Sequence, residues 1–163
     1  MINKRLGCMA ILFFLLVFSV SASMVSVLLI ETGIGEDVSS GQYTSLWEGG
    51  LMEAFFDAGH IITNSPIARM ERKPDRDFTG STAGEYADAV NGGVEFLILG
   101  YLEYEVRGQR AVPVSVTLKL YSCGSQSLIH EQRFPAGTGT TLDDEYQMAI
   151  DAGRAMIPHL SKR

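Results

Sequence analysis

The pattern of apolar and polar positions along the chain predicts five β-strands. Residues 24–30 and 94–99 are almost continuously apolar, as is typical of strands buried on both faces of a sheet. Residues 114–121 alternate strictly between apolar and polar side chains, which indicates a strand with one buried face. The β-branched run 60–63 and the segment 128–134 are bounded by turn-forming residues and predict two further strands.

Three helices are expected between and after these strands. Ser45 with Glu48, and Thr82 with Glu85, have the spacing of capping boxes, in which two side chains satisfy free backbone N–H groups at a helix start. The acidic residues 143–145 favour the start of a third helix, because negative charge is stabilised at a helix N-terminus. Apolar positions at helical spacing follow each of these starts.

The resulting order of elements is β-α-β-α-β-β-β-α. It predicts an α/β (mixed α+β) fold with a five-stranded mixed sheet and helices packed on it. Residues 24–163 are expected to form a single globular domain, since no internal repeat or linker interrupts them. Residues 67–81 are expected to be a charged loop.

The first 22 residues have the organisation of a secretory signal peptide. Lys4 and Arg5 form a short basic start, residues 6–20 are almost wholly apolar, and Val20–Ser21–Ala22 provides small side chains for cleavage after Ala22. The alternative is an uncleaved leader that anchors the chain in the inner membrane. The apolar run is shorter than the roughly 20 residues of a typical spanning helix, which favours cleavage.

The net charge and the number of cysteines argue against several kinds of partner and against an internal disulfide. Removing the leader leaves 11 basic and 19 acidic residues, a net charge of −8, which argues against nucleic acid and anionic membrane surfaces as partners. Only Cys123 remains after cleavage, so no internal disulfide forms. Cys8 lies at the start of the apolar run, whereas a lipidated cysteine follows such a run. The expected location is the bacterial periplasm, with no membrane insertion after cleavage.

No catalytic, cofactor or metal motif is expected. Gly33 and Gly35 follow a strand, but Val38 stands where a dinucleotide fingerprint requires a third glycine. The chain's three histidines lack the spacing of metal ligands. Glu103 and Glu105 share one face of a strand, about 7 Å apart, and are interpreted as solvated side chains. We therefore expect no enzyme activity and no cofactor.

A contact surface is predicted on the charged loop. The loop is the longest and most charged of the mature chain, and loops of this kind often carry function. Tyrosines on the neighbouring strand add aromatic contact area. The predicted surface consists of Arg69, Arg72, Lys73, Arg76, Tyr101 and Tyr104.

Several strand segments resemble a group of small bacterial envelope domains. The Gly59–Ile62 junction, the glycine-bounded strand 93–100, the strand and turn 114–124 and the returning strand 128–131 match its pattern. The group comprises the curli-secretion lipoprotein, lipoprotein activators of penicillin-binding proteins, a flagellar accessory lipoprotein and the amino-terminal domain of the Tol–Pal translocation protein. The chain departs from the lipoproteins in having no lipobox after its apolar run. The resemblance implies a non-enzymatic periplasmic domain that docks onto another envelope protein.

These observations favour an exported periplasmic accessory module that acts through protein–protein contact. Two alternatives remain open. One is a small periplasmic enzyme or ligand-binding domain with its site at the strand ends, near residues 31–37 or 100–105. The other is a structural subunit that self-assembles. The partner and the oligomeric state are not determined by the sequence.

Overall fold

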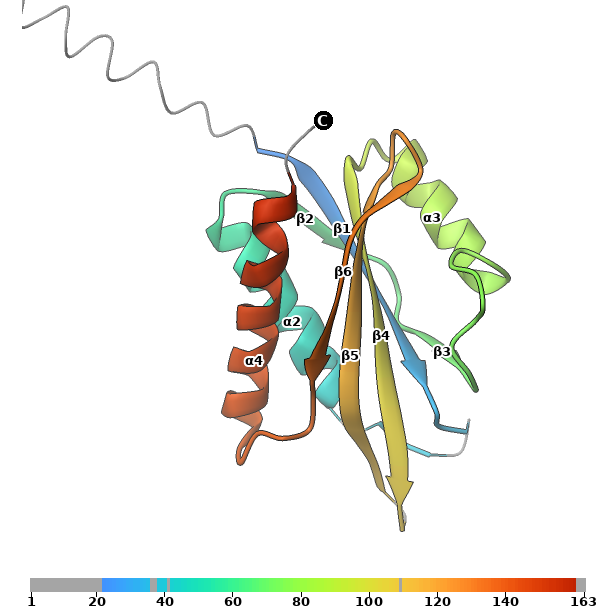
Figure 1. Cartoon of the computed structure of the whole chain (residues 1–163), viewed down its shortest axis with the longest axis vertical. Coiled ribbons are helices and arrows are strands. Elements are labelled where there is room, and N and C mark those ends of the chain that lie inside the picture. The colour runs from blue at the N-terminus through green and yellow to red at the C-terminus, as the bar shows by residue number, and fades with distance from the viewer. Residues whose placement is uncertain (1–21, 36–37, 41, 109, 161–163) are drawn as a thin grey trace, which may run out of the picture.

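The computed structural model describes residues 22–35, 38–40, 42–108 and 110–160. The predicted signal peptide lies almost wholly outside these residues. The described chain folds as one mixed sheet with helices on both of its faces (Figure 1). In chain order its elements are β1 (Met24–Thr32), α2 (Tyr43–Asp57), β2 (Ile61–Asn64), β3 (Ala68–Met70), α3 (Ser81–Asn91), β4 (Phe96–Arg107), β5 (Arg110–Ser122), β6 (Ser127–Pro135), α4 (Leu142–Met156) and the 3₁₀ turn η1 (Ile157–His159).

The sheet has the strand order β2-β1-β4-β5-β6, and β3 also pairs with β1. β1 runs parallel to β2, β3 and β4, whereas β4, β5 and β6 form an antiparallel meander. The predicted mixed α/β class is therefore confirmed. The sheet contains six strands where five were expected, because the short strand β3 lies inside the segment predicted to be loop.

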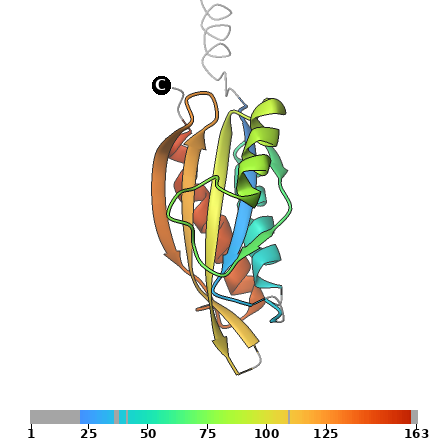
Figure 2. The same ribbon diagram turned by 90° about the vertical axis from the view of Figure 1, so that its right-hand side faces the viewer.

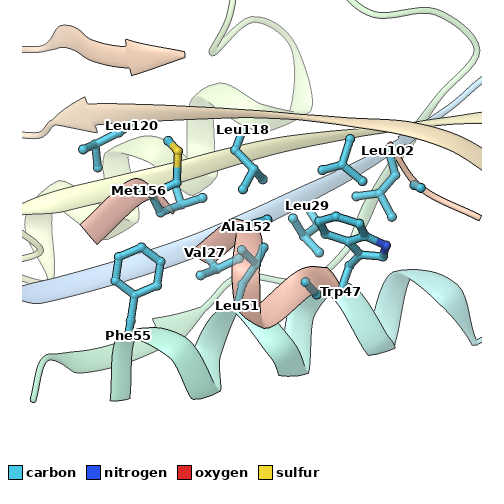
Figure 3. Close-up of a cluster of buried hydrophobic side chains, with 14 of the residues drawn as sticks. Val27, Leu29, Trp47, Leu51, Phe55, Leu102, Leu118, Leu120, Ala152 and Met156 are labelled. Atoms are coloured by element: carbon cyan, nitrogen blue, oxygen red, sulfur yellow. The ribbon is translucent and has the colours of Figure 1, made fainter. Parts of the chain in front are cut away.

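Helices α2 and α4 cover one face of the sheet, which we call the α2/α4 face (Figure 1). Apolar side chains from β1, β4 and β5 point toward the two helices and form the larger core (Figure 3). This core contains Val27, Leu29, Trp47, Leu51, Phe55, Leu102, Leu118, Leu120, Ala152 and Met156. Burial of such side chains supplies most of the driving force for folding.

The two helices pack closely because small residues face each other between them. A Cβ atom added at Gly50 of α2 would lie 2.6 Å from the Cβ of Ala149, and one at Gly153 of α4 would lie 2.7 Å from the Cβ of Ala54. Real Cβ atoms do not approach so closely, so each glycine allows the neighbouring helix to lie against its backbone.

The opposite face of the sheet, the α3 face, is covered by α3 and by residues 71–80. Residues 71–80 connect β3 to α3 and cross in front of the strands of the sheet (Figure 2). We call this segment the strap. The smaller core beneath includes Leu28, Leu97, Leu99, Tyr101, Tyr121 and Cys123.

Two predicted capping boxes are wrong. Helix α2 begins at Tyr43, before Ser45, and its cap residue Gln42 makes no side-chain capping bond. The hydroxyl of Thr82 donates to the carbonyl of Thr79 in the preceding turn, and α3 has no side-chain cap. The predicted start of the third helix is confirmed, where Thr141 and Asp144 form a reciprocal capping box.

Candidate functional site

Three hydrogen-bond donors on the α3 face converge on the carboxylate of Asp77, which belongs to the strap. The Tyr101 hydroxyl donates to Oδ1 at 2.8 Å, Lys119 Nζ donates to Oδ2 at 2.7 Å, and the Tyr121 hydroxyl also donates to Oδ2. Tyr101 lies on β4 and the other two donors lie on β5, so the sheet itself builds this carboxylate site. The Asp77 and Lys119 side chains are only 10% and 13% exposed, so the ion pair is largely removed from water.

The pKa values at this site follow from its geometry. Burial acts to raise the pKa of Asp77, but hydrogen bonds from Lys119, Tyr121 and Tyr101 and the nearby ammonium charge outweigh it, so the pKa lies below its ordinary value. Burial and hydrogen bonding to the carboxylate raise the pKa values of Tyr101 and Tyr121 well above that of ordinary tyrosine. At neutral pH, Asp77 is therefore an anion and both phenols keep their protons.

Phe78 follows Asp77 and occupies an aromatic slot. Its ring centroid lies 4.2 Å from that of Tyr86 and 4.7 Å from that of Tyr121, the second pair meeting edge to face. The backbone of Phe78 has a φ of 56°, in the left-handed region, which costs a non-glycine residue about 1 kcal/mol. The buried hydroxyl of Tyr86, in the same slot, has no hydrogen-bond partner among the described residues.

The structure separates the six residues that were predicted to form one contact surface. Tyr101 and Tyr104 are 0% and 5% exposed, so the prediction that they form an aromatic surface patch is wrong. The strap covers the α3 face where Tyr101 lies, and Tyr104 packs into the core beneath α2. Arg72 and Arg76 are exposed on the strap, and their role in binding stays a prediction.

Lys73 and Arg69 both contact neighbouring elements of the fold, although Arg69 remains exposed. Lys73 is half-buried, with Nζ 5.0 Å from the centroid of the Tyr101 ring, a cation–π distance. Arg69 lies on β3 and donates from Nε and Nη2 to Oε2 of Glu31, at 2.9 and 2.6 Å. Both cations are therefore held by neighbouring elements of the fold.

Glu31 anchors the end of β1 to the start of α2. Its Oε1 accepts a 2.5 Å hydrogen bond from the Thr44 hydroxyl, which also lies 2.7 Å from the Tyr104 hydroxyl. Burial acts to raise the pKa of Glu31, but hydrogen bonds from Ser40, Thr44 and Arg69 and the charge of Arg69 outweigh it and lower the pKa. Both carboxylate oxygens are thus engaged in structural contacts.

Glu145 is a second buried carboxylate, at the start of α4. It is 1% exposed and accepts from Trp47 Nε1 at 2.7 Å and from the backbone N–H of Gly137 at 2.9 and 3.0 Å. Burial, and after it the charges of Glu31 and Glu145, raise the pKa of Tyr104, which lies near the strand ends named in the enzyme alternative. The oxygens of both carboxylates are bonded to the protein's own donors, as is typical of structural buried carboxylates.

Glu103 and Glu105 on β4 differ in their surroundings. Oε2 of Glu103 accepts from Arg133 at 2.6 Å and from Ser115 at 3.0 Å, and its side chain is 31% exposed. Glu105 is exposed and pairs with Arg107 at 3.2 Å. The interpretation of these residues as solvated therefore fits Glu105 better than Glu103.

The three histidines lie apart from these carboxylates. His130 on β6 and His159 in η1 stack with ring centroids 3.7 Å apart and planes at 11°. Nδ1 of His60 accepts from the backbone N–H of Ser23 at 3.3 Å. Among the described residues, no group of three or more His, Cys, Asp or Glu is placed to hold a metal ion. Within the same residues, no helix has the length and apolar character needed to cross a membrane.

A hollow of about 590 Å³ opens beside β6, at the end of the sheet where β4 begins. Phe96, the β5–β6 turn and the C-terminal residues Pro158 and His159 contribute to its lining. Leu128 and Ile129 of β6 line it too, although they are 46% and 37% exposed. No pattern in the sequence predicts this hollow, because its lining comes from three distant segments with no shared motif.

No protein-family model and no curated protein matches the chain. Among solved structures, a variant PelC dodecamer from Paraburkholderia phytofirmans matches at 12% identity and a TM-score of 0.49, over 86% of this chain and 90% of that chain. A lipoprotein from Neisseria meningitidis matches at 12% identity and a TM-score of 0.43, over 84% and 98%. TolB from Acinetobacter baumannii matches at 11% identity and a TM-score of 0.43, over 86% of this chain and 28% of its own length. At this level the likenesses assign no function to the chain.

Proposed function

We propose that this chain is an exported accessory module of the bacterial cell envelope that acts through protein–protein contact. The signal-like leader, the acidic mature charge and the resemblance to small envelope domains support the proposal. The partner is another envelope protein, and the contact takes place in the periplasm.

The exposed edge strand β6 is the observation that carries this proposal. β6 pairs with β5 on one side only, so within the described residues its outer edge has no neighbouring strand. An exposed edge of this length is a template for pairing with an extended segment of another chain. Leu128 and Ile129 add exposed apolar area beside the hollow, which is the composition of a contact surface.

Site-specific photo-crosslinking in cells tests this function. A photoreactive residue placed at Ile129 of the full chain is expected to form an adduct of discrete mass with one envelope protein. Phe56 on α2 is 69% exposed and serves as the matched control position, where no adduct is expected. Equal labelling from both positions, or an exported chain with no adduct at Ile129, would contradict the proposal. An adduct of twice the chain's own mass would instead support self-assembly.

A further inference from the structure

We infer that the strap fills a peptide-binding site on the α3 face, and that a partner segment with an acidic residue followed by an aromatic residue displaces it. Asp77 and Phe78 occupy the site as such a segment would. The inference goes beyond the proposed function, because it depends neither on export nor on the edge of β6.

The sheet provides a complete set of partners for one carboxylate. Two phenol hydroxyls and one ammonium, from Tyr101, Tyr121 and Lys119, all point to the Asp77 oxygens. These donors lie on two paired strands of the sheet and not on the strap, and Lys119 Nζ also lies 3.8 Å from Oε2 of Glu131 on β6. Charge-assisted hydrogen bonds of this kind are the strong ones in recognition.

The neighbouring slot selects an aromatic ring. Tyr86 of α3 and Tyr121 of β5 contact the ring of Phe78 on two sides. Aromatic pairs at these distances are favourable beyond the area they bury, so an aromatic side chain suits this slot.

The strap is held by side chains rather than by its backbone. Among the described residues, no backbone–backbone hydrogen bond involves residues 72–78, and the carbonyl of Arg76 accepts only a local bond from the Thr79 hydroxyl, at 3.1 Å. Phe78 also adopts its left-handed backbone only at a cost in conformational energy. A free peptide presents the same two side chains without that strain, so it competes with the strap for the site.

The chemistry of the site points to a peptide rather than to a polyanion. One ammonium and two neutral phenols match a single carboxylate, and the aromatic slot lies directly beside it. The chain as a whole carries a net charge of −6, which repels a polyphosphate or nucleic acid.

The test removes the strap groups that occupy the site and measures whether a peptide binds in their place. The variant Asp77→Ser with Phe78→Gly removes the carboxylate and the aromatic ring of the strap, and glycine accepts the left-handed backbone at position 78. Acetyl-Asp-Phe-amide is titrated into this variant and into the unsubstituted chain by calorimetry. We expect binding to the emptied variant, and binding about tenfold weaker or worse to the unsubstituted chain, whose strap competes.

Two controls separate recognition from non-specific binding. Acetyl-Asn-Phe-amide lacks the charge and is expected not to bind. Adding Lys119→Met to the emptied variant removes the ammonium, and we expect it to abolish binding of the Asp peptide. A folded emptied variant that fails to bind the Asp peptide, or binds the Asn peptide equally well, overturns the inference.

A second measurement uses the unsubstituted chain and therefore does not require the double variant to fold. Trypsin cleaves after Arg76, which is exposed on the strap, and displacement of the strap exposes the bond that follows it. Excess acetyl-Asp-Phe-amide is therefore expected to accelerate cleavage after Arg76 in the unsubstituted chain, whereas the Asn peptide is not. Equal cleavage rates with and without the Asp peptide overturn the inference.

Discussion

Arg69 and Glu31 form an ion pair across two parallel strands, with Nε and Nη2 of the guanidinium 2.9 and 2.6 Å from Oε2 of the carboxylate. The two residues are register partners between β3 and β1, so the strand pairing itself brings them together. The Glu31 side chain is 5% exposed and that of Arg69 is 33% exposed. The pair therefore joins the short strand β3 to β1.

The substitution Arg69→Met is expected to destabilise the fold by about 2 kcal/mol, because it leaves the Glu31 charge buried without its cation. The value is below that of a fully buried pair because water reaches part of Arg69. Urea unfolding measures the change. Arg154→Met on α4 removes an exposed pair with Asp151 and is expected to cost less than about 0.5 kcal/mol. Equal losses in the two variants would refute a structural role for the Glu31 pair.

Acid is expected to destabilise the protein through Asp77. The folded-state pKa of this carboxyl is lowered, so its stabilising contribution is fully present above the unfolded pKa of about 3.9 and is lost as the pH falls through the folded value. This contribution is measured by urea unfolding of the unsubstituted chain and of Asp77→Asn, from pH 6 down to below the unfolded pKa of about 3.9. The loss of stability on acidification should be smaller in the variant, and an identical pH profile in both would contradict the assignment.

Glu145→Ala is expected to destabilise the protein by about 3 kcal/mol. The substitution leaves the indole N–H of Trp47 and the backbone N–H of Gly137 buried without an acceptor. Trp47 is the chain's single tryptophan, so a red shift of its fluorescence reports entry of water at the same place. Glu53→Ala, which removes an exposed acceptor of the Tyr146 hydroxyl, is the control and should shift neither quantity appreciably.

Two glycine-to-alanine substitutions in helices are expected to act in opposite directions. Gly50→Ala places a Cβ 2.6 Å from that of Ala149 and 2.8 Å from the carbonyl oxygen of Tyr146, and should cost about 1 to 3 kcal/mol. Gly84→Ala on α3 meets no atom within 4 Å and should stabilise by about 0.5 to 1 kcal/mol through helix propensity. Thermal unfolding of both variants checks the sign, and stabilisation by Gly50→Ala would contradict the close packing of α2 on α4.

The elements that could be predicted from the sequence are those whose burial is either uniform or regularly periodic along the segment. β1 and the first half of β4 are buried on both faces, so their apolar runs appear directly in the sequence. β3 was missed because its three residues lie within a charged segment and have no period of their own. The capping boxes at Ser45 and Thr82 failed because the caps of the two helices lie three and two residues earlier, at Gln42 and Gly80.

The candidate site could not be predicted, because it depends on where the strap lies. Tyr101 falls in the alternating part of β4, a pattern that suggests a solvent-facing side chain, yet the strap buries it. Asp77 was one of several charges in a loop, and nothing in its sequence neighbourhood indicates that β4 and β5 hold it. Glu145 likewise fits a solvated helix start, whereas the Trp47 indole reaches it from a helix about 100 residues away in the chain.

The intact mass of the chain, recovered from a membrane-free periplasmic extract after mild cross-linking, tests the proposed export and partner contact most directly. The proposal predicts a species that begins at Ser23, together with a cross-linked species heavier by the mass of one discrete envelope protein. A full-length chain confined to the membrane pellet, or a mature chain that never acquires a partner, would contradict it.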